Sequence, residues 1–540
     1  MNTTIRSAML AVLSMSGVTL AAPSLWVETT GTMILSNRME GAKKEIELSG
    51  AKNECVSIQL ALRSSQEAVK PWAFEWTSLK RTGGIEIAKS NVELFRAWDI
   101  DVNHGSKENR SKDPIRARPL GLFPDALIPL YTADGVNIAN AIQPAKDCTA
   151  SFWVDITIPA GIQPGLYSGS ITLKTDDAPL VIPVKLTVAN VEIPAETTIP
   201  SMYNLREGGK HVAKYFDTYV KIVMAHRIQP TNYHYRELKP EFADRYNPGG
   251  KGFVSVMFGS NADPAKSADN LKAVTAHLKE KGIFDRAFVQ LKDEPKAEDI
   301  APALAVGKFI LQTCPEWKGK IAQKLSRDEG SDLFQLVDHH VYPLAPYVPA
   351  WGANAPTYGK NKYGRADWDK IRSQDGKQLW FYMSNNQGTP FPTFDINTPE
   401  VAFEPRIVMW MWWYEKAYGH LFWDLVGATG FKLNGKFPPG DGQLLYEGDL
   451  ATPMSPTWAV SKDVKAPVIS RRMKLMRNGI GEWEMLKMAQ KKFGYEKVAA
   501  IVAKVYDHMG SRGDPGQSLM WSYKESDWDQ ARAELLKLLE

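Results

Sequence analysis

Two adjacent carboxylates, Asp293 and Glu294, come shortly after the apolar run Phe288–Leu291, and Pro295 follows them directly. The run predicts a short buried strand, and the proline prevents that strand from continuing. In a β/α architecture the carboxyl ends of the strands carry the chemistry, because the loops there converge on one open face. The pattern therefore predicts an acid pair presented to a cleft. The alternative is that Asp293 caps a helix that starts at the proline, with acidic residues in its solvated first turn.

Paired carboxyl groups are what glycoside cleavage ordinarily needs, one as an acid and one as a nucleophile or base. Neighbouring side chains point to opposite faces of a regular strand, so Asp293 and Glu294 can cooperate only if the strand ends between them. Adjacency also suits a substrate-assisted variant, in which the 2-acetamido oxygen of the sugar attacks the anomeric carbon. In that variant the first carboxylate stabilises the amide, and the second carboxyl protonates the leaving oxygen.

Aromatic and histidine side chains on later strands are candidates for a sugar site, with plain core packing as the alternative for each. His340 and Tyr342 share one strand face, and Trp380 and Tyr382 share a face of the next strand. Tyr382 could donate a hydrogen bond to the acetamide oxygen, and Trp423 could form an apolar floor under the sugar. Each is an expectation about substrate binding.

The sequence gives no support for a metal or an organic cofactor. His339 and His340 are adjacent, but one core residue and one pocket residue is a better interpretation than a metal pair. No CxxC or HExxH spacing occurs, and Gly440-Asp441-Gly442 lacks the Lys-Ser/Thr of a phosphate loop. We expect no metal and no cofactor.

Beyond residue 200 the pattern alternates between strands and helices. One helix is predicted from Asp263-Pro264 to Lys281, with Leu271, Val274 and Leu278 on one face. Eight strands in alternation is the number that a (β/α)₈ barrel requires, and Asp293-Glu294 would follow the fourth. The predicted strands are Ser201–Leu205, Ile228–Tyr233, Phe253–Phe258, Ala287–Leu291, Lys320–Leu325, Phe334–Tyr342, Leu379–Ser384 and His420–Leu425.

The segments on either side of this barrel have different patterns. Residues 23–197 contain many short strands separated by turns, as in the alternating Cys55–Leu62, which predicts a β-sandwich. The sandwich groups no acids or nucleophiles, so we interpret it as a supporting module. The barrel is assigned to residues 198–465. Residues 466–540 are charged and helical in period, which predicts a helical extension packed on the barrel.

The first 22 residues predict a cleaved signal peptide, with Arg6, the apolar run Ala8–Ala22 and a small-residue site before Pro23. The mature protein is therefore expected to be periplasmic or secreted. No membrane span is predicted, because the apolar run Ile407–Tyr414 is far shorter than the ~20 residues a span needs. The net charge of +4 comes without a concentrated basic tract, which does not suggest nucleic acid. Three scattered cysteines exclude a disulfide framework, although one bridge remains possible.

Several segments spread over nearly the whole mature chain form an ordered set: Asn53-Glu54 with Gln59, Gln163–Gly169, Asp293-Glu294-Pro295, Gly419–Trp423, Gly440–Tyr446 and Ser470–Ile480. In this set the sequence resembles glycoside hydrolase family 123. The resemblance implies a retaining β-N-acetylgalactosaminidase that works by substrate assistance, with Asp293 as the stabiliser and Glu294 as the acid/base. Its partner would be a glycan or oligosaccharide, and the sequence does not indicate an oligomeric state.

Two segments depart from the family pattern. Tyr446-Glu447-Gly448 stands where Tyr-Pro-Gly is usual, and Asp338–Tyr342 stands where an apolar or tryptophan-bearing segment is expected. These departures leave the mechanism alone but leave the sugar and the linkage open. The alternatives are a hydrolase of another 2-acetamido or modified sugar with the same chemistry, and a non-catalytic glycan-binding protein. A binder would have no need for two acids that are costly to desolvate.

Overall fold

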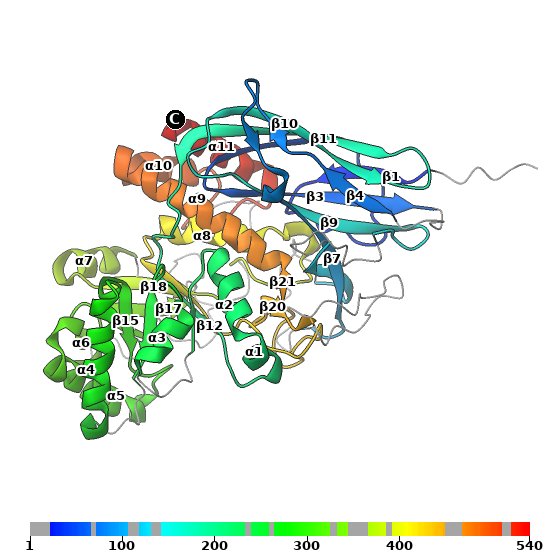
Figure 1. Ribbon diagram of the computed structural model, residues 1–540. Coiled ribbons are helices and arrows are strands. Elements are labelled where there is room, and N and C mark those ends of the chain that lie inside the picture. The colour runs from blue at the N-terminus through cyan, green and yellow to red at the C-terminus, as the bar shows by residue number, and fades with distance from the viewer. Residues whose placement is uncertain are drawn as a thin grey trace, which may run out of the picture.

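The computed structural model describes residues 22–65, 72–105, 118–130, 142–232, 239–258, 264–324, 332–343, 365–384, 391–448, 467–509 and 520–540. A β-sandwich lies at the top of Figure 1 and a β/α barrel at the bottom, with helices α8 (Glu404–Tyr414) and α9 (Arg471–Phe493) between them. The predicted fold class, a β-sandwich followed by a (β/α)₈-like barrel, is confirmed. The predicted signal peptide lies almost entirely outside the described residues.

The sandwich consists of two sheets packed face to face. One sheet has the order β1-β3-β9-β7-β8-β21-β20, and the other has the order β2-β11-β10-β5-β6 with β4 also paired to β10. Apolar side chains of both sheets, such as Leu60, Phe152 and Leu186, form one core between them. The strands are β1 (Ser24–Glu28), β2 (Ile46–Lys52), β3 (Cys55–Ser64), β4 (Ala73–Trp76), β5 (Leu79–Lys80), β6 (Glu86–Ile87), β7 (Val92–Val102), β8 (Gly121–Pro129), β9 (Cys148–Thr157), β10 (Gly165–Lys174), β11 (Leu180–Glu192), β20 (Leu445–Tyr446) and β21 (Val468–Ser470).

Strand β3 differs from the half-buried strand that its alternation predicts. Its polar residues Ser57 and Gln59 are buried as well as its apolar ones. The Ser57 hydroxyl donates to Asp155 of β9 at 2.7 Å, and the Asn478 side chain of α9 donates to Ser57 at 3.1 Å. Because α9 covers the polar face of this sheet, β3 is buried on both sides.

The barrel is one eight-stranded sheet with the order β13-β12-β19-β18-β17-β16-β15-β14. All its recorded strand pairs are parallel, and Thr231 of β13 donates to the Ser255 carbonyl of β14 at 3.2 Å, which brings the two edge strands together. The strands are β12 (Ser201–Asn204), β13 (Pro230–Thr231), β14 (Val254–Met257), β15 (Ala287–Gln290), β16 (Ile321–Lys324), β17 (His339–Pro343), β18 (Gln378–Tyr382) and β19 (Gly419–Phe422).

Helices separate consecutive barrel strands, as the alternation predicts. They are α1 (Lys210–Lys214), α2 (Phe216–Ala225), α3 (Pro240–Tyr246), α4 (Pro264–Glu280), α5 (Ala297–Thr313), α6 (Asp332–Leu336), α7 (Arg365–Asp375) and α8. The predicted helix at 263–281 corresponds to α4, with Leu271, Val274 and Leu278 fully buried. One boundary was wrong: Phe334 lies in α6 rather than in the sixth strand. That apolar run is too short to separate a buried helix turn from a strand by periodicity.

The C-terminal segment joins the sandwich as well as the barrel. Strand β21 pairs with β8, so β20 and β21 extend the first sandwich sheet. Helices α9, α10 (Tyr495–Val502) and α11 (Glu525–Leu539) follow. In Figure 1 α9 runs alongside α8 beneath the sandwich. The apolar run at 407–414 lies in α8, where every residue from Ile407 to Trp413 is buried.

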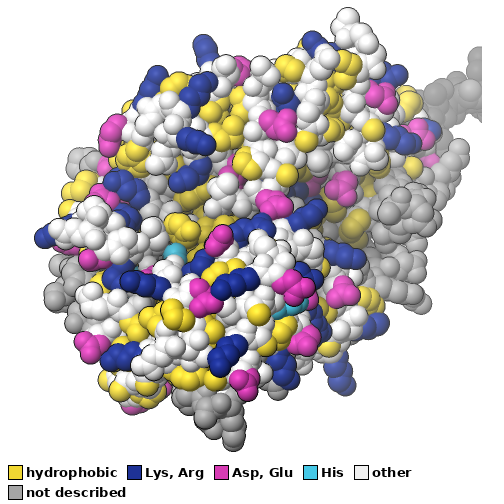
Figure 2. Space-filling view, turned by 60° about the vertical axis from the view of Figure 1, so that its left-hand side comes forward, with side chains coloured by type: hydrophobic (Ala, Val, Ile, Leu, Met, Phe, Trp, Pro, Cys, Tyr) yellow, Lys and Arg dark blue, Asp and Glu magenta, His cyan; other side chains and the backbone are white. Residues whose placement is uncertain are grey.

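The described surface carries both signs of charge. On the face drawn in Figure 2, Lys/Arg and Asp/Glu side chains are interspersed rather than gathered by sign. Within the described residues no helix is long and apolar enough to cross a bilayer.

Candidate active site

Asp293 and Glu294 lie just beyond the carboxyl end of β15, the fourth barrel strand. The last residue of this strand, Gln290, pairs with Met257 of β14, and the chain then leaves the sheet. Glu294 has φ of +43°, in the left-handed region that residues other than glycine seldom occupy. Because neither residue is in regular strand, their side chains are not forced to opposite faces. Both are exposed at the open end of the barrel.

The structure contradicts the helix-cap alternative for Asp293. Helix α5 begins at Ala297, with Lys296 as its N-cap residue. The backbone N–H of Lys296 donates to the Asp299 side chain at 3.1 Å, so Asp299 serves the start of this helix. Asp293 is therefore outside the helix and its cap.

Lys324, the last residue of β16, contacts the carboxylate pair. This lysine was not identified from the sequence. Its Nζ lies 2.6 Å from Oε1 of Glu294. Burial lowers the pKa of Lys324, but the nearby Tyr382, Asp293 and Glu294 outweigh burial and raise it overall. The sequence contained one indication of this position. Lys324 is two residues after Ala322 on the same strand, so its side chain faces the barrel interior as that of Ala322 does.

Trp380 and Tyr382 both face the barrel interior, where they join one apolar cluster. The Lys324 ammonium lies 4.3 Å from the centre of the Tyr382 ring, which places Tyr382 beside the carboxylate pair. Trp380 is fully buried and donates from its indole N–H to Nδ1 of His339 at 3.2 Å. Of these two predicted sugar-site residues, the structure therefore brings only Tyr382 to the acids.

His340 and Tyr342 lie on the opposite, helix-facing side of β17. The His340 ring is fully buried, 4.2 Å from the Phe334 ring of α6 and 5.4 Å from Trp368 of α7. Tyr342 packs on the same tryptophan, with ring centres 6.1 Å apart. This placement favours the packing alternative for both residues and does not bring them to the acid pair.

His339 and His340 do not form a pair of ligands, since adjacent strand residues point to opposite sides. His339 faces Phe288 inside the barrel, and burial lowers its pKa to about 4. In the part of the chain that the structure describes, no group of three His, Cys, Asp or Glu residues lies close enough to hold a metal.

Trp423 follows β19 at the carboxyl end of the barrel, four strands away from β15 and hence across the barrel mouth. Its indole N–H donates to Asp441 at 2.7 Å, and its ring lies 4.8 Å from that of Phe437. A Cβ on Gly442, whose φ is +70°, would lie 2.2 Å from the Trp423 ring, so glycine is required there. The loop thus fixes Trp423 as a half-buried aromatic at the rim.

Asp424 and Arg206 add an ion pair to this side of the mouth, with 3.1 Å between Nε of Arg206 and Oδ2 of Asp424. The Asp424 side chain is buried, and this burial raises its pKa to about 6, although Arg206 opposes the shift. No sequence pattern pointed to Arg206 or Asp424 as a site residue. Their pairing depends on β12 and β19 being neighbours, which no local pattern shows.

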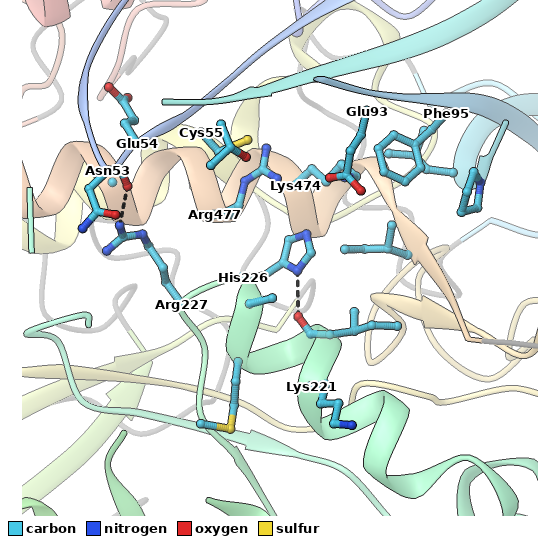
Figure 3. Close-up of a pocket in the computed structure, with 18 of the residues that line it drawn as sticks. Asn53, Glu54, Cys55, Glu93, Phe95, Lys221, His226, Arg227, Lys474 and Arg477 are labelled. Atoms are coloured by element: carbon cyan, nitrogen blue, oxygen red, sulfur yellow. Dashed lines mark hydrogen bonds between the residues drawn. The ribbon is translucent and has the colours of Figure 1, made fainter. Parts of the chain in front are cut away.

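A separate cavity of about 620 Å³ lies between the sandwich, α2 and α9. Figure 3 shows Cys55 and Glu93 on the sandwich side, His226 below them, and Lys474 and Arg477 on α9. Lys474 and Arg477 both pair with Asp155, at 2.5 and 2.8 Å. None of the cavity residues is a candidate acid of the barrel mouth, and we interpret the cavity as part of the junction between the domains.

Comparison with protein families supports the interpretation of the barrel. A family model described as the glycoside hydrolase 123 catalytic domain matches residues 205–489, which include Asp293, Glu294 and Lys324. A second model, the glycoside hydrolase 123 N-terminal domain, matches residues 35–175 of the sandwich. The chain therefore belongs to glycoside hydrolase family 123, a family of glycosidases.

One solved structure has a similar fold over nearly the whole chain. A family 123 glycoside hydrolase from Clostridium perfringens, reported for glycolipid glycan hydrolysis, is 14% identical with a TM-score of 0.66, covering 96% of this chain and 97% of that one. A β-glucuronidase from Bacteroides uniformis is 8% identical over 74% of this chain and 49% of that one, and its TM-score of 0.26 is too low to support an argument. No curated protein sequence matches this chain.

Proposed function

We propose that this protein is a retaining glycosidase that releases β-linked N-acetylgalactosamine by substrate-assisted catalysis. The observation that supports this most is the adjacent pair Asp293 and Glu294 beyond the fourth barrel strand of a family 123 catalytic domain. Adjacent carboxylates suit a mechanism in which the sugar supplies its own nucleophile, so no enzyme carboxylate is needed on its far side.

In the proposed reaction the acetamido oxygen attacks the anomeric carbon while the glycosidic C–O bond breaks. Glu294 gives its proton to the leaving oxygen and becomes a carboxylate. Asp293 stabilises the positive charge on the resulting oxazolinium ion. Glu294 then takes a proton from water, which adds to the anomeric carbon on the face that the leaving group occupied. The anomeric configuration is retained, and Glu294 recovers its proton.

The sugar is tested with aryl 2-acetamido-2-deoxy-β-glycosides that differ only at C4. We expect the galacto compound to be cleaved with the higher kcat/KM. A preference for the gluco compound would change the proposed substrate to N-acetylglucosamine and leave the proposed mechanism unchanged. If the glycans bind but neither compound nor any glycolipid glycan is cleaved, the protein is a glycan-binding member of the family.

The stereochemistry is tested by proton NMR of the first sugar formed. Retention requires a β-configured product before mutarotation. An α-configured first product would exclude substrate assistance, because direct attack by water from the opposite face inverts the anomeric centre.

We further propose that the protein is exported and begins near Pro23 after cleavage of its signal peptide. The support is in the sequence: a positive charge at Arg6, a short apolar run and small residues before Pro23. N-terminal sequencing of the protein from the cell envelope or medium tests this. An intact Met1 on that protein would contradict it.

A further inference from the structure

Lys324 holds an ammonium group against the proposed acid. Its side chain is only 11% exposed, whereas that of Glu294 is 56% exposed, and Nζ and Oε1 are 2.6 Å apart. The lysine is thus fixed in the barrel wall, and the glutamate meets it from the rim. A hydrogen bond between charged partners at this distance is short and strong.

The surroundings of Lys324 keep it charged. It lies over the face of the Tyr382 ring at 4.3 Å, an arrangement in which a ring attracts a cation. The net effect of Tyr382, Asp293 and Glu294 against burial is a raised pKa for Lys324. The lysine is therefore an ammonium ion over the whole neutral range and donates no proton in the reaction.

A general acid changes charge during catalysis. Glu294 is neutral before it protonates the leaving oxygen and is a carboxylate afterwards, so negative charge develops on it in the transition state. A fixed cation beside a group that gains negative charge stabilises the transition state more than the ground state. Lys324 occupies that position with respect to Glu294.

We propose that Lys324 is a positioning residue for this reaction, which orients Glu294 and stabilises the carboxylate formed when Glu294 releases its proton. The proposal rests on the proposed function, because it requires Glu294 to be the acid. The proton moves from Glu294 to the leaving oxygen as the glycosidic bond breaks, and Lys324 keeps all three of its protons.

Few other charged groups in the described residues face this pair. Asp293 lies on the same loop, and Tyr382 is the titratable neighbour from β18. Lys292 turns to Asp299 instead, at 3.3 Å, and Lys296 is exposed at the start of α5. Across the mouth, Arg206 and Asp424 pair with each other. Lys324 is thus the cation in contact with Glu294.

The test is how kcat/KM of K324M depends on the leaving group. An ammonium ion beside the carboxylate that forms on Glu294 stabilises the step in which the proton leaves, so its loss should matter most where that proton transfer limits the rate. We expect kcat/KM to fall on the order of 10-fold to 100-fold for poor leaving groups, part of the contribution of a general acid, and less for activated aryl glycosides.

Two further variants serve as controls. K324R keeps the charge and should keep the dependence of kcat/KM on the leaving group near that of the wild type. K292M removes a neighbouring ammonium that contacts Asp299 rather than Glu294, and should leave that dependence unchanged. Thermal melts of all three variants confirm folding, and if K324M does not fold, K324Q replaces it in the same comparison.

The outcomes separate this inference from the proposed function. If E294Q keeps its activity toward poor leaving groups, Glu294 is not the acid and both proposals fail. If E294Q shows the expected loss but K324M keeps wild-type kcat/KM for poor leaving groups, only the role of Lys324 is excluded. An equal loss in K324M, K324R and K292M would also exclude it, because the effect would then not follow the charge at residue 324.

Discussion

At the scale of single residues, two adjacent carboxylates have different surroundings. Glu294 forms an ion pair with Lys324 and has a left-handed backbone. Asp293 does not have a positive φ, and its charge raises the pKa of Lys324 without a hydrogen bond to it. A left-handed residue other than glycine is destabilising by about 1 kcal/mol or more. A sequence that tolerates this strain at one acid of a pair indicates that the orientation of that acid matters.

The different roles of the two acids predict different kinetics. E294Q removes the proton donor, so kcat/KM should fall most for substrates with poor leaving groups and little for activated aryl glycosides. D293N removes the charge that stabilises the oxazolinium ion, so its loss should be similar for every leaving group. For substrates with poor leaving groups, each loss should be on the order of 10²–10³ in rate. The measurement is kcat/KM across aryl glycosides of graded leaving-group acidity.

A matched control is E298Q, an exposed carboxylate four residues further on, in the first turn of α5. It should have wild-type kinetics. The same leaving-group dependence in E294Q and D293N would show that the roles are assigned wrongly. Near-normal activity in both variants would remove the pair from the mechanism.

Asp424 predicts a pH dependence of stability. Its pKa in the folded state, about 6 because of burial, lies above the ordinary 3.8, so the folded protein holds this proton more tightly than the unfolded chain. Its contribution to stability is full below about pH 4 and is lost as the pH rises through 6. D424N should therefore abolish this component, and the difference in melting temperature between wild type and D424N should change between pH 4 and pH 6. A constant difference over that range would contradict the prediction.

For single residues, the sequence predicts which side chains share a face of a strand, because side chains alternate along it. It shows that Trp380 and Tyr382 share a face of one strand and that His340 and Tyr342 share a face of another. It does not show which of these faces points into the barrel. Barrel strands are apolar on both sides, and a shift of one residue exchanges the two faces. Lys324 and Asp424 were missed for a related reason: each meets its partner from a neighbouring strand.

At the scale of elements, the close contact of α8 and α9 depends on a glycine. A Cβ on Gly479 would lie 2.2 Å from the backbone oxygen of Arg406, where α9 crosses α8. A Cβ on Gly481, two residues along the same helix, would find nothing nearer than 3.7 Å. Backbone cannot move aside as a flexible side chain can, so these two glycines differ in what an added methyl group does.

G479A should therefore separate α9 from α8 and destabilise the protein by about 1–3 kcal/mol, the usual effect of overpacking. G481A should be neutral or stabilising by up to about 1 kcal/mol, because alanine is the better helix former. Thermal unfolding of the two variants in parallel measures this. Equal midpoints would show that the two helices do not depend on their close approach.

The eight barrel strands could be predicted because each is a short apolar run between turns and helices. The connection of the C-terminal segment to the sandwich could not. Strands β20 and β21 have two and three residues. Strand β21 pairs with β8, more than 300 residues earlier, and β20 pairs only with β21. Pairing at that separation leaves no local pattern, so the segment was expected on the barrel alone.

At the scale of the whole molecule, buried ion pairs join the sandwich to α9. Asp155 of β9 is fully buried and accepts from Lys474 at 2.5 Å and from Arg477 at 2.8 Å. Asp125 of β8 pairs with Arg472 at 2.9 Å. These three cations lie in the segment at 470–480 whose sequence resembles the family, so that segment connects the domains rather than contacting the acids of the mouth.

The connection between the sandwich and α9 depends on the charge of Asp155. Burial alone would raise the pKa of Asp155, but Arg477 and Lys474 outweigh it and hold the pKa well below its ordinary value. A carboxyl group with a lowered pKa stabilises the fold at all pH values above its unfolded pKa, and this contribution is lost only as the pH falls through the folded pKa. At neutral pH, D155N leaves two buried cations without a counterion, and breaking such a cluster is destabilising by roughly 3–5 kcal/mol. We expect a lower thermal midpoint, with part of the loss recovered in D155N/K474M, because that double variant also removes one of the uncompensated charges.

E75Q serves as the control. Glu75 and Lys174 form an exposed ion pair, with side chains 60% and 57% exposed, so the thermal midpoint of E75Q should not change. If D155N has the same thermal midpoint as E75Q and the wild type, the cluster does not hold the sandwich to α9.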